Sequence, residues 1–363
     1  MKLSKRALLR GMAAGAMLYA AHAGAAADSV AASPKPGRRA YRRYACEEAF
    51  STPAVTAELT RLAGGIPSMR SGPIKGPFMA NLLDLGEGRL RGMDEAGIDV
   101  QILSLVTPGV QSFDAATAIS LMRDVNDRMQ AAIKAHPTRF GGLATVAPQA
   151  PAESAKELER AVHALRLNGA IINSHTNGEY LDNQRYWPIL EAIEALDIPL
   201  YIHPRDPAPG LAGPLDIPGF AVGWGYAVET GTHAVRLIGG GVFDRFPRLR
   251  IVLGHLGETL PFLLDRLDNR YLWQTNVFGH RSIKRLPSEY FRDNFLITTS
   301  GMNYSAPLKA ALAAMGPDKV LFAADHPMEV QKDAVDELEA IDIAPEVKAK
   351  IFETNVRRVF RMS

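Results

Sequence analysis

From residue 44 onward, short apolar runs alternate with longer segments in which apolar residues recur every three or four positions. Short apolar runs of this kind are typical of buried parallel strands. Eight strands are predicted, at residues 44–48, 100–106, 140–146, 170–173, 199–203, 249–254, 295–299 and 320–323. Helices are predicted at residues 115–135, 151–167, 187–196, 227–239, 259–267 and 308–315.

The end of the chain is predicted to form one more amphipathic helix. Residues 345–360 carry apolar side chains at Val347, Ile351, Val356 and Phe360 on a charged background. This C-terminal helix is expected to close the domain.

Eight strands in alternation with helices predict an α/β fold, a single-domain (β/α)8 (TIM) barrel spanning residues 44–363. A doubly wound open sheet is the main alternative. No glycine-rich phosphate fingerprint follows the first strand, so a dinucleotide-binding fold has no support. Loop insertions at residues 59–90 and 206–225 follow the first and fifth strands, where long loops often cover a substrate.

The beginning of the chain has the pattern of an export signal. A basic start that includes Lys5 and Arg6 precedes a small-apolar stretch at 11–21 and alanine-rich cleavage sites. The stretch is shorter than the roughly 20 apolar residues of a membrane span. SKRALLR is similar to a twin-arginine signal with lysine in the first paired position, and ordinary secretion stays open. We therefore expect a cleaved signal at residues 1–27, a flexible basic lead-in at 28–43, and a periplasmic or secreted protein with no membrane segment in its mature form.

Composition and charge exclude several classes of partner. The chain has 363 residues, of which 47% are hydrophobic, enough for a sizeable core. Its 41 basic and 39 acidic residues nearly balance, so no nucleic-acid partner is expected. The single cysteine, Cys46, excludes an intrachain disulfide.

Polar side chains follow several of the predicted strands where each strand ends. The strand at 199–203 ends in His203 and a proline, the first strand carries Glu47, and Asp325 follows the eighth. In a barrel these ends converge on one face. Two carboxylates and an imidazole suit a divalent cation that keeps positions open for water and substrate. Without a cation, one buried carboxyl of such a cluster would have to take up a proton.

Each of these residues could also have a purely structural or solvent-exposed role. Glu47 and Glu48 could be solvated residues past the strand, and that is what we expect of Glu48. Asp325 could cap the helix that follows it. His255 and Glu258, in GHLGE after the sixth strand, could open a helix at residue 259. Several coincidences at several strand ends are harder to explain than one site, so we favour the joint interpretation.

The sequence resembles a known family over residues 44–360. The runs CEEAFSTP, ILSLVTPGVQ, YIHPR, GVFDRFPRLRIVLGHLGE, ITTSG and LFAADHP occur in this order. Together they are similar to the amidohydrolase-related metal-dependent decarboxylases, which include the aminocarboxymuconate semialdehyde, γ-resorcylate, 5-carboxyvanillate and 2,3-dihydroxybenzoate decarboxylases. The resemblance implies a (β/α)8 barrel with one catalytic divalent metal ion.

The resemblance also implies a metal ligand set. By position, Glu47, His203 and Asp325 are the ligands. Many family members have a second histidine two residues after the first acid, where this chain has Ala49. Because residues i and i+2 of a strand share a face, that histidine would point at the metal. The remaining set of one nitrogen and two oxygens favours manganese or magnesium, with zinc as the alternative.

The catalytic residues follow from the same resemblance. Asp325 is implicated in proton transfer, His255 and Glu258 form a catalytic pair beside the metal, and Arg266 helps to hold the substrate. We expect non-oxidative decarboxylation of an aromatic acid with a hydroxyl ortho to the carboxylate, both oxygens chelating the metal. The alternatives are a metal-dependent hydrolase of a lactone or related carboxylated ring, and a metal-less binding protein on the same fold. By analogy with the family, a homodimer or homotetramer is expected.

Overall fold

The computed structural model describes residues 39–62, 76–279 and 281–362. The predicted signal at 1–27 and most of the lead-in lie outside these residues. Tyr41–Ser363 form one compact unit. Within the predicted lead-in, the Tyr41 hydroxyl donates to Glu339 at 2.8 Å and the Arg43 guanidinium pairs with the same carboxylate at 2.6 Å. The barrel unit therefore begins slightly earlier than the predicted strand at residue 44.

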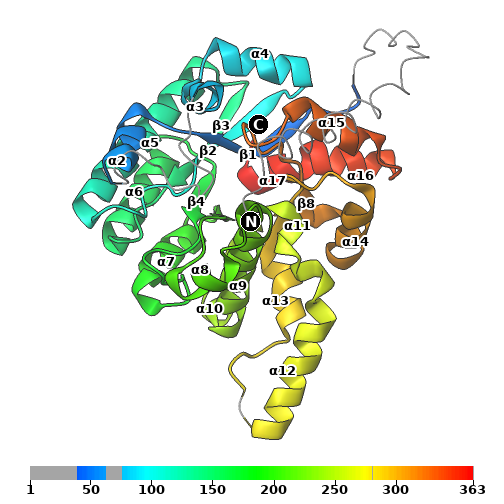
Figure 1. The fold of residues 1–363 in the computed structure, drawn as a ribbon. Coiled ribbons are helices and arrows are strands. Elements are labelled where there is room, and N and C mark those ends of the chain that lie inside the picture. The colour runs from blue at the N-terminus through cyan, green and yellow to red at the C-terminus, as the bar shows by residue number, and fades with distance from the viewer. Residues whose placement is uncertain (1–38, 63–75, 280, 363) are drawn as a thin grey trace, which may run out of the picture. The chain divides into compact units, whose positions relative to one another are not determined.

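Eight parallel strands form one sheet in chain order, and helices surround it (Figure 1). The strands are β1 (Tyr44–Phe50), β2 (Val100–Leu105), β3 (Phe140–Thr145), β4 (Gly169–Asn173), β5 (Pro199–His203), β6 (Arg250–Leu253), β7 (Phe295–Thr298) and β8 (Val320–Leu321). The amide of Cys46 donates to the Phe322 carbonyl at 3.1 Å, which links the first strand to the segment after the last. The sheet is thus a nearly closed barrel, and the predicted fold class is confirmed.

Helices account for most of the described residues outside the strands. They are α2 (Pro53–Leu62), α3 (Pro77–Leu83), α4 (Glu87–Ala96), α5 (Ala115–Ala135), α6 (Pro151–His163), α7 (Trp187–Ala195), α8 (Pro209–Leu215), α9 (Ala227–Gly239), α10 (Val242–Arg245), α11 (His255–Glu258), α12 (Leu264–Phe278), α13 (Pro287–Asn294), α14 (Ser305–Met315), α15 (Gln331–Ala340), α16 (Pro345–Ala349) and α17 (Asn355–Phe360). No helix in the described part of the chain is both long and apolar enough to span a membrane.

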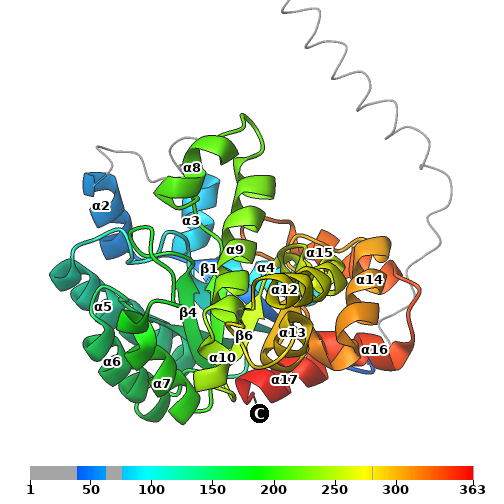
Figure 2. The same cartoon turned by 90° about the horizontal axis from the view of Figure 1, so that it is seen from below.

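The barrel has a core of its own, closed at one end by α17. Side chains from every strand, such as Ile102 and Val252, pack together inside it with Val356 and Phe360 of α17. Figure 2 shows α17 at one end of the barrel and α2, α3 and α8 at the other. These last helices belong to the segments that leave β1 and β5, so the predicted insertions lie at the carboxyl ends of the strands.

The helix predicted at residues 259–267 is wrong. Five consecutive residues, from His255 to Thr259, have φ between 50° and 80°. A right-handed helix needs negative φ, and residues other than glycine rarely adopt the left-handed region of positive φ. The chain therefore makes a left-handed turn, and the right-handed helix α12 begins only at Leu264 and continues to Phe278.

A buried histidine ties the loop after β4 to helix α9. His233 is fully buried; its Nε2 accepts the Leu181 amide at 3.2 Å and its Nδ1 lies 3.2 Å from the Ser174 hydroxyl. Burial, together with the charges of His175 and Arg236, lowers the pKa of His233 to about 3. A proton on Nε2 would face the Leu181 N–H, so the site admits only the neutral ring.

We expect His233 to weaken the fold in acid. Below about pH 6.5 the unfolded chain protonates this histidine, whereas the folded chain does so only near pH 3. The unfolded state then binds more protons, so stability falls as the pH decreases through this window. In His233→Gln, the slope of unfolding free energy against pH should shrink by about 1.4 kcal/mol per pH unit. Urea unfolding at several pH values measures it, and an unchanged slope would contradict the assignment.

Candidate active site

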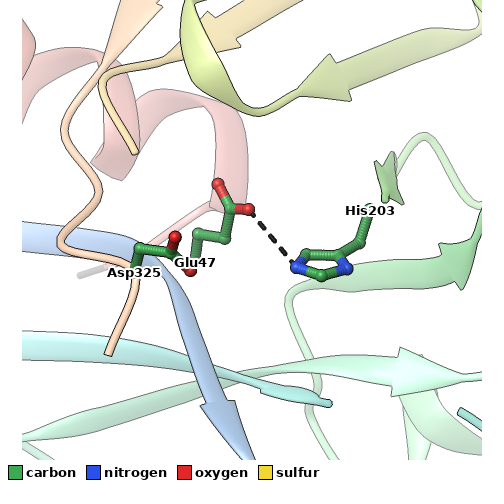
Figure 3. Close-up of side chains that lie close together, drawn as sticks. All are labelled: Glu47, His203 and Asp325. Atoms are coloured by element: carbon green, nitrogen blue, oxygen red, sulfur yellow. Dashed lines mark ion pairs between the residues drawn. The ribbon is translucent and has the colours of Figure 1, made fainter. Parts of the chain in front are cut away.

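Three potential metal ligands meet at the carboxyl end of the barrel (Figure 3). Glu47 lies on β1, His203 ends β5, and Asp325 follows β8. Each offers one ligand atom, and these atoms all lie within 4.8 Å of one another. His203 Nε2 is 3.6 Å from Glu47 Oε1. The structure therefore brings together the predicted ligand set, with one nitrogen and two carboxylates.

The imidazole of His203 is held in the orientation that a metal ligand needs. Its Nδ1 donates to the Pro204 carbonyl at 2.7 Å. The proton is thereby assigned to Nδ1, which leaves the lone pair of Nε2 facing Glu47. An outer hydrogen bond of this kind typically fixes the tautomer and the ring plane of a metal-binding histidine.

The carboxylate of Glu47 has one satisfied and one unsatisfied oxygen. Oε2 accepts hydrogen bonds from the Tyr201 hydroxyl and, at 3.1 Å, from Thr298. Oε1 is buried and has no hydrogen-bond partner among the described residues. Burial raises the pKa of Glu47; Asp325 adds to the rise, while His255 and His203 oppose it. A buried, unpartnered carboxylate oxygen beside an available imidazole nitrogen fits a divalent cation.

Strand β1 is buried along its whole length and has a bulge next to its two neighbouring glutamates. Ala45 pairs with Gln101 and Glu48 with Leu103, so β1 has one residue more than β2 between these pairs. Bulges of this kind re-aim side chains next to active sites. The expectation that Glu48 is solvated is wrong: Glu48 is fully buried and accepts the Ala324 amide at 2.9 Å.

Asp325 has an unusual backbone conformation. Its φ is +56°, in the left-handed region. It does not cap a helix, because α15 begins at Gln331, six residues later. Its Oδ2 lies 3.9 Å from Nε2 of His255. The aspartate therefore faces both the metal ligands and the imidazole.

His255 and Glu258 form a pair inside the left-handed turn. His255 Nδ1 lies 2.7 Å from Glu258 Oε1. Burial by itself lowers the pKa of His255, but the charge and hydrogen bond of Glu258, together with the nearby Asp325, outweigh it, and the pKa is raised well above its ordinary value. The turn thus places the imidazole between two carboxylates, an arrangement suited to proton transfer.

A pocket of about 400 Å³ opens over these groups. Its wall includes His255, Glu258 and Asp325, together with Met302 from the loop after β7 and Met328 from the loop after β8. The segment that follows His203 also contributes, through Val222, Gly223, Tyr226 and Ala227. The predicted role of insertion 206–225 as a substrate loop is consistent with this position.

The position of the missing histidine is occupied by apolar packing. Ala49 is only 6% exposed and belongs to a cluster with Leu82 and Val106. Phe78, Met79 and Met328 pack against it. Ala49 therefore contributes to an apolar wall near the ligands.

Arg266 lies away from this pocket. It is exposed on α12 and lines a separate groove with Leu263, Arg270 and Tyr271. Within one chain, the structure does not bring it together with Asp325.

Two residues that support the site were not assigned a role from the sequence. Tyr201 and Thr298 both donate to Glu47. A signal for Tyr201 was present, because it lies two residues before His203 on β5 and must share its face. For Thr298 no specific signal was present in the sequence, because it is one of several polar residues at the end of β7.

The family model Amidohydrolase matches residues 81–362 of the chain. The chain belongs to the amidohydrolase family. Its relatives in this family include γ-resorcylate decarboxylase of Polaromonas sp., which is 36% identical over 88% of this chain and 99% of the relative.

Solved structures of other family members share the fold. The structure of 5-carboxyvanillate decarboxylase from Sphingomonas paucimobilis has a TM-score of 0.85 and 42% identity, covering 89% of this chain and 99% of that one. A dihydroxybenzoic acid decarboxylase from Polaromonas sp., solved with bound manganese and the inhibitor 2-nitroresorcinol, has a TM-score of 0.79 and 36% identity, covering 89% and 97%.

The comparisons and the ligand triad together confirm the predicted activity class and cofactor. The chain is a metal-dependent, non-oxidative decarboxylase of hydroxylated aromatic acids, and thus a carboxy-lyase. Its cofactor is a divalent metal ion, with manganese bound in relatives and Glu47, His203 and Asp325 as its site here.

Proposed function

We propose that the substrate is an aromatic acid with a hydroxyl ortho to the carboxylate, as in 2,6- or 2,3-dihydroxybenzoate, and that Asp325 is the proton donor. The observation that carries the proposal is the position of Asp325, which reaches the metal ligands on one side and His255 on the other. A divalent cation, held by Glu47, His203 and Asp325, would supply positive charge for the carboxylate and the ortho oxygen.

The reaction follows from these positions. Asp325 donates a proton to the ring carbon that carries the carboxylate, so a C–H bond forms and aromaticity is lost. The bond from this carbon to the carboxylate then breaks, its electron pair restores the aromatic ring, and carbon dioxide leaves. No water is consumed. The ring product carries the donated proton, so Asp325 must be reprotonated before the next turnover.

His255 and Glu258 are placed to support this proton transfer. Their 2.7 Å contact fixes the imidazole, whose Nε2 is turned toward Asp325. In that position His255 can return a proton to Asp325, while Glu258 stabilises the charged ring. Groups of this kind typically contribute about 10²–10⁴-fold in rate.

The ortho requirement is tested with matched substrates. With manganese present, 2,6-dihydroxybenzoate and salicylate should be decarboxylated, and 4-hydroxybenzoate should be slower by about 10²-fold or more in kcat/KM, because it lacks the second chelating oxygen. Equal rates for the ortho and para hydroxy acids would contradict the proposal.

We infer that the active form is a homodimer or a homotetramer. Helix α12 extends beyond the ring of helices in Figure 1. It exposes large apolar side chains: Leu272, Trp273, Val277 and Phe278 are each 46% to 69% exposed. A second copy would cover this face. Arg266 can take part in substrate binding only if assembly brings α12 to the pocket of another copy. Light scattering at several protein concentrations checks the assembly, and a monomer throughout would refute it.

We also propose that the protein is exported to the periplasm or secreted. The support is the basic start followed by small-apolar and alanine-rich stretches in residues 1–27. Cell fractionation of the full chain, compared with a variant in which Lys5 and Arg6 are replaced by glutamine, checks it. Equal cytoplasmic retention of both would argue against export.

A further inference from the structure

The buried carboxylate of Glu48 lies behind the metal site and has no part in the reaction described above. It is fully buried, and both of its oxygens accept hydrogen bonds. Oε1 accepts the Ala324 amide at 2.9 Å, and Oε2 accepts from the Gln101 amide group at 3.2 Å. Ala324 immediately precedes Asp325, so Glu48 binds the backbone next to the catalytic aspartate.

The residue on the other side of Asp325 is held as well. The Ala49 amide donates to the His326 carbonyl at 2.7 Å. The side-chain amide of Gln331 donates to His326 Nδ1 at 2.9 Å. Asp325, with its left-handed φ, is therefore fixed through both neighbouring residues. A strained conformation at a functional site persists only where its surroundings determine it in this way.

One buried network joins these contacts. Gln101 donates both to Glu48 and, at 2.7 Å, to Gln331. Arg89, only 3% exposed, donates to Gln101 at 3.1 Å and to the Ala49 carbonyl at 2.6 Å. The network connects β1, which carries Glu47, to the segment that carries Asp325. Because each member is bonded to another, a change at one transmits to the rest.

We propose that Glu48 is a positioning residue: through Ala324 it holds Asp325 in the conformation that turns its carboxylate to the metal and the substrate. Arg89, Gln101 and Gln331 complete the support. The role rests on the proposed function of Asp325, and it is distinct from metal binding, since Glu48 points away from the pocket and bonds to the backbone. Outer residues of this kind typically change metal affinity or activity by about 10–100-fold when they are altered.

The test is Glu48→Gln, which keeps the size of the side chain. Ala324 and Gln101 donate to different oxygens of Glu48, so a glutamine offers its carbonyl oxygen to one of them and turns an NH2 donor toward the other. We expect kcat for 2,6-dihydroxybenzoate to fall about 10-fold or more, with KM little changed. The affinity for Mn²⁺ alone, measured by calorimetric titration, should fall by a similar factor.

The matched control is Glu157→Gln. Glu157 is another buried glutamate (3% exposed), and it bonds to Asn126 and Arg160 on the outer helices. This variant should lower the melting temperature without changing Mn²⁺ affinity.

A double-mutant cycle separates positioning from a general structural effect. If Glu48 acts through Asp325, Glu48→Gln should weaken Mn²⁺ binding in the wild type but not in an Asp325→Ala background. Equal losses of Mn²⁺ affinity in both backgrounds, or wild-type affinity and kcat in Glu48→Gln, would overturn the proposal.

If Glu48→Gln does not fold, Gln331→Leu at the edge of the network serves instead. It should show smaller losses of kcat and Mn²⁺ affinity, and wild-type values of both would overturn the proposal. Wild-type protein inert on every ortho-hydroxy acid would instead contradict the proposed function, while the Mn²⁺ cycle would still decide the role of Glu48.

Discussion

The Asp325→Asn variant is expected to keep the barrel and to lose about 10²–10⁴-fold in kcat, or all measurable turnover. Asparagine has nearly the same size and still offers an oxygen to a cation, so the metal site should survive in part. Its amide does not deliver a proton to a ring carbon. The loss should therefore appear in kcat, measured as carbon dioxide release from 2,6-dihydroxybenzoate at saturating manganese, with a circular dichroism spectrum like that of the wild type.

The control for this variant is Asp333→Asn on α15, eight residues farther along the chain, which leaves the pocket intact and should retain wild-type kcat. Wild-type activity in Asp325→Asn would remove Asp325 from proton delivery. His255, which also lines the pocket, would then be the next donor to test.

Loss of the metal is expected to abolish decarboxylation. It should also reverse the order of stability of the wild type and the Glu47→Gln variant. At a manganese concentration 100 times its dissociation constant, the wild type should gain about 2.7 kcal/mol in unfolding free energy over the metal-free protein. Glu47→Gln should gain little, since it lacks the anionic ligand. Without metal, Glu47 is a buried carboxylate with an unsatisfied oxygen close to Asp325, so the glutamine variant should be at least as stable as the wild type.

Thermal unfolding of both proteins with chelator and with manganese measures this reversal. Equal responses of wild type and Glu47→Gln to manganese would contradict the assignment of Glu47 as a ligand. Activity that survives complete chelation would contradict metal dependence itself.

Much of the barrel is predictable from hydrophobic periodicity. The strands are short apolar runs buried on both faces, and the helices at 115–135 and 227–239 have the predicted limits. The carboxyl ends of parallel strands meet at one end of a barrel, which is why Glu47, His203 and Asp325 could be placed together before any coordinates.

The features that were not predictable are those in which local rules are broken. The run from His255 to Thr259 contains four residues other than glycine in the left-handed region, which local preference does not predict. Two adjacent glutamates of β1 are both buried because the strand is covered on both faces, whereas local sequence favours a solvated position for such a residue. Arg266 could be assigned only by analogy, and it lies exposed in the first turn of α12, outside the pocket.

The most direct test of the account is to incubate metal-analysed protein, freed of residues 1–27, with 2,6-dihydroxybenzoate and manganese, and to quantify carbon dioxide and the ring product together. A metal-dependent decarboxylase should carry a single metal ion per chain and release equimolar carbon dioxide and resorcinol, both lost on chelation and in Asp325→Asn. A metal-loaded protein that releases no carbon dioxide from any ortho-hydroxy acid, or that adds water to a lactone ring instead, would contradict it.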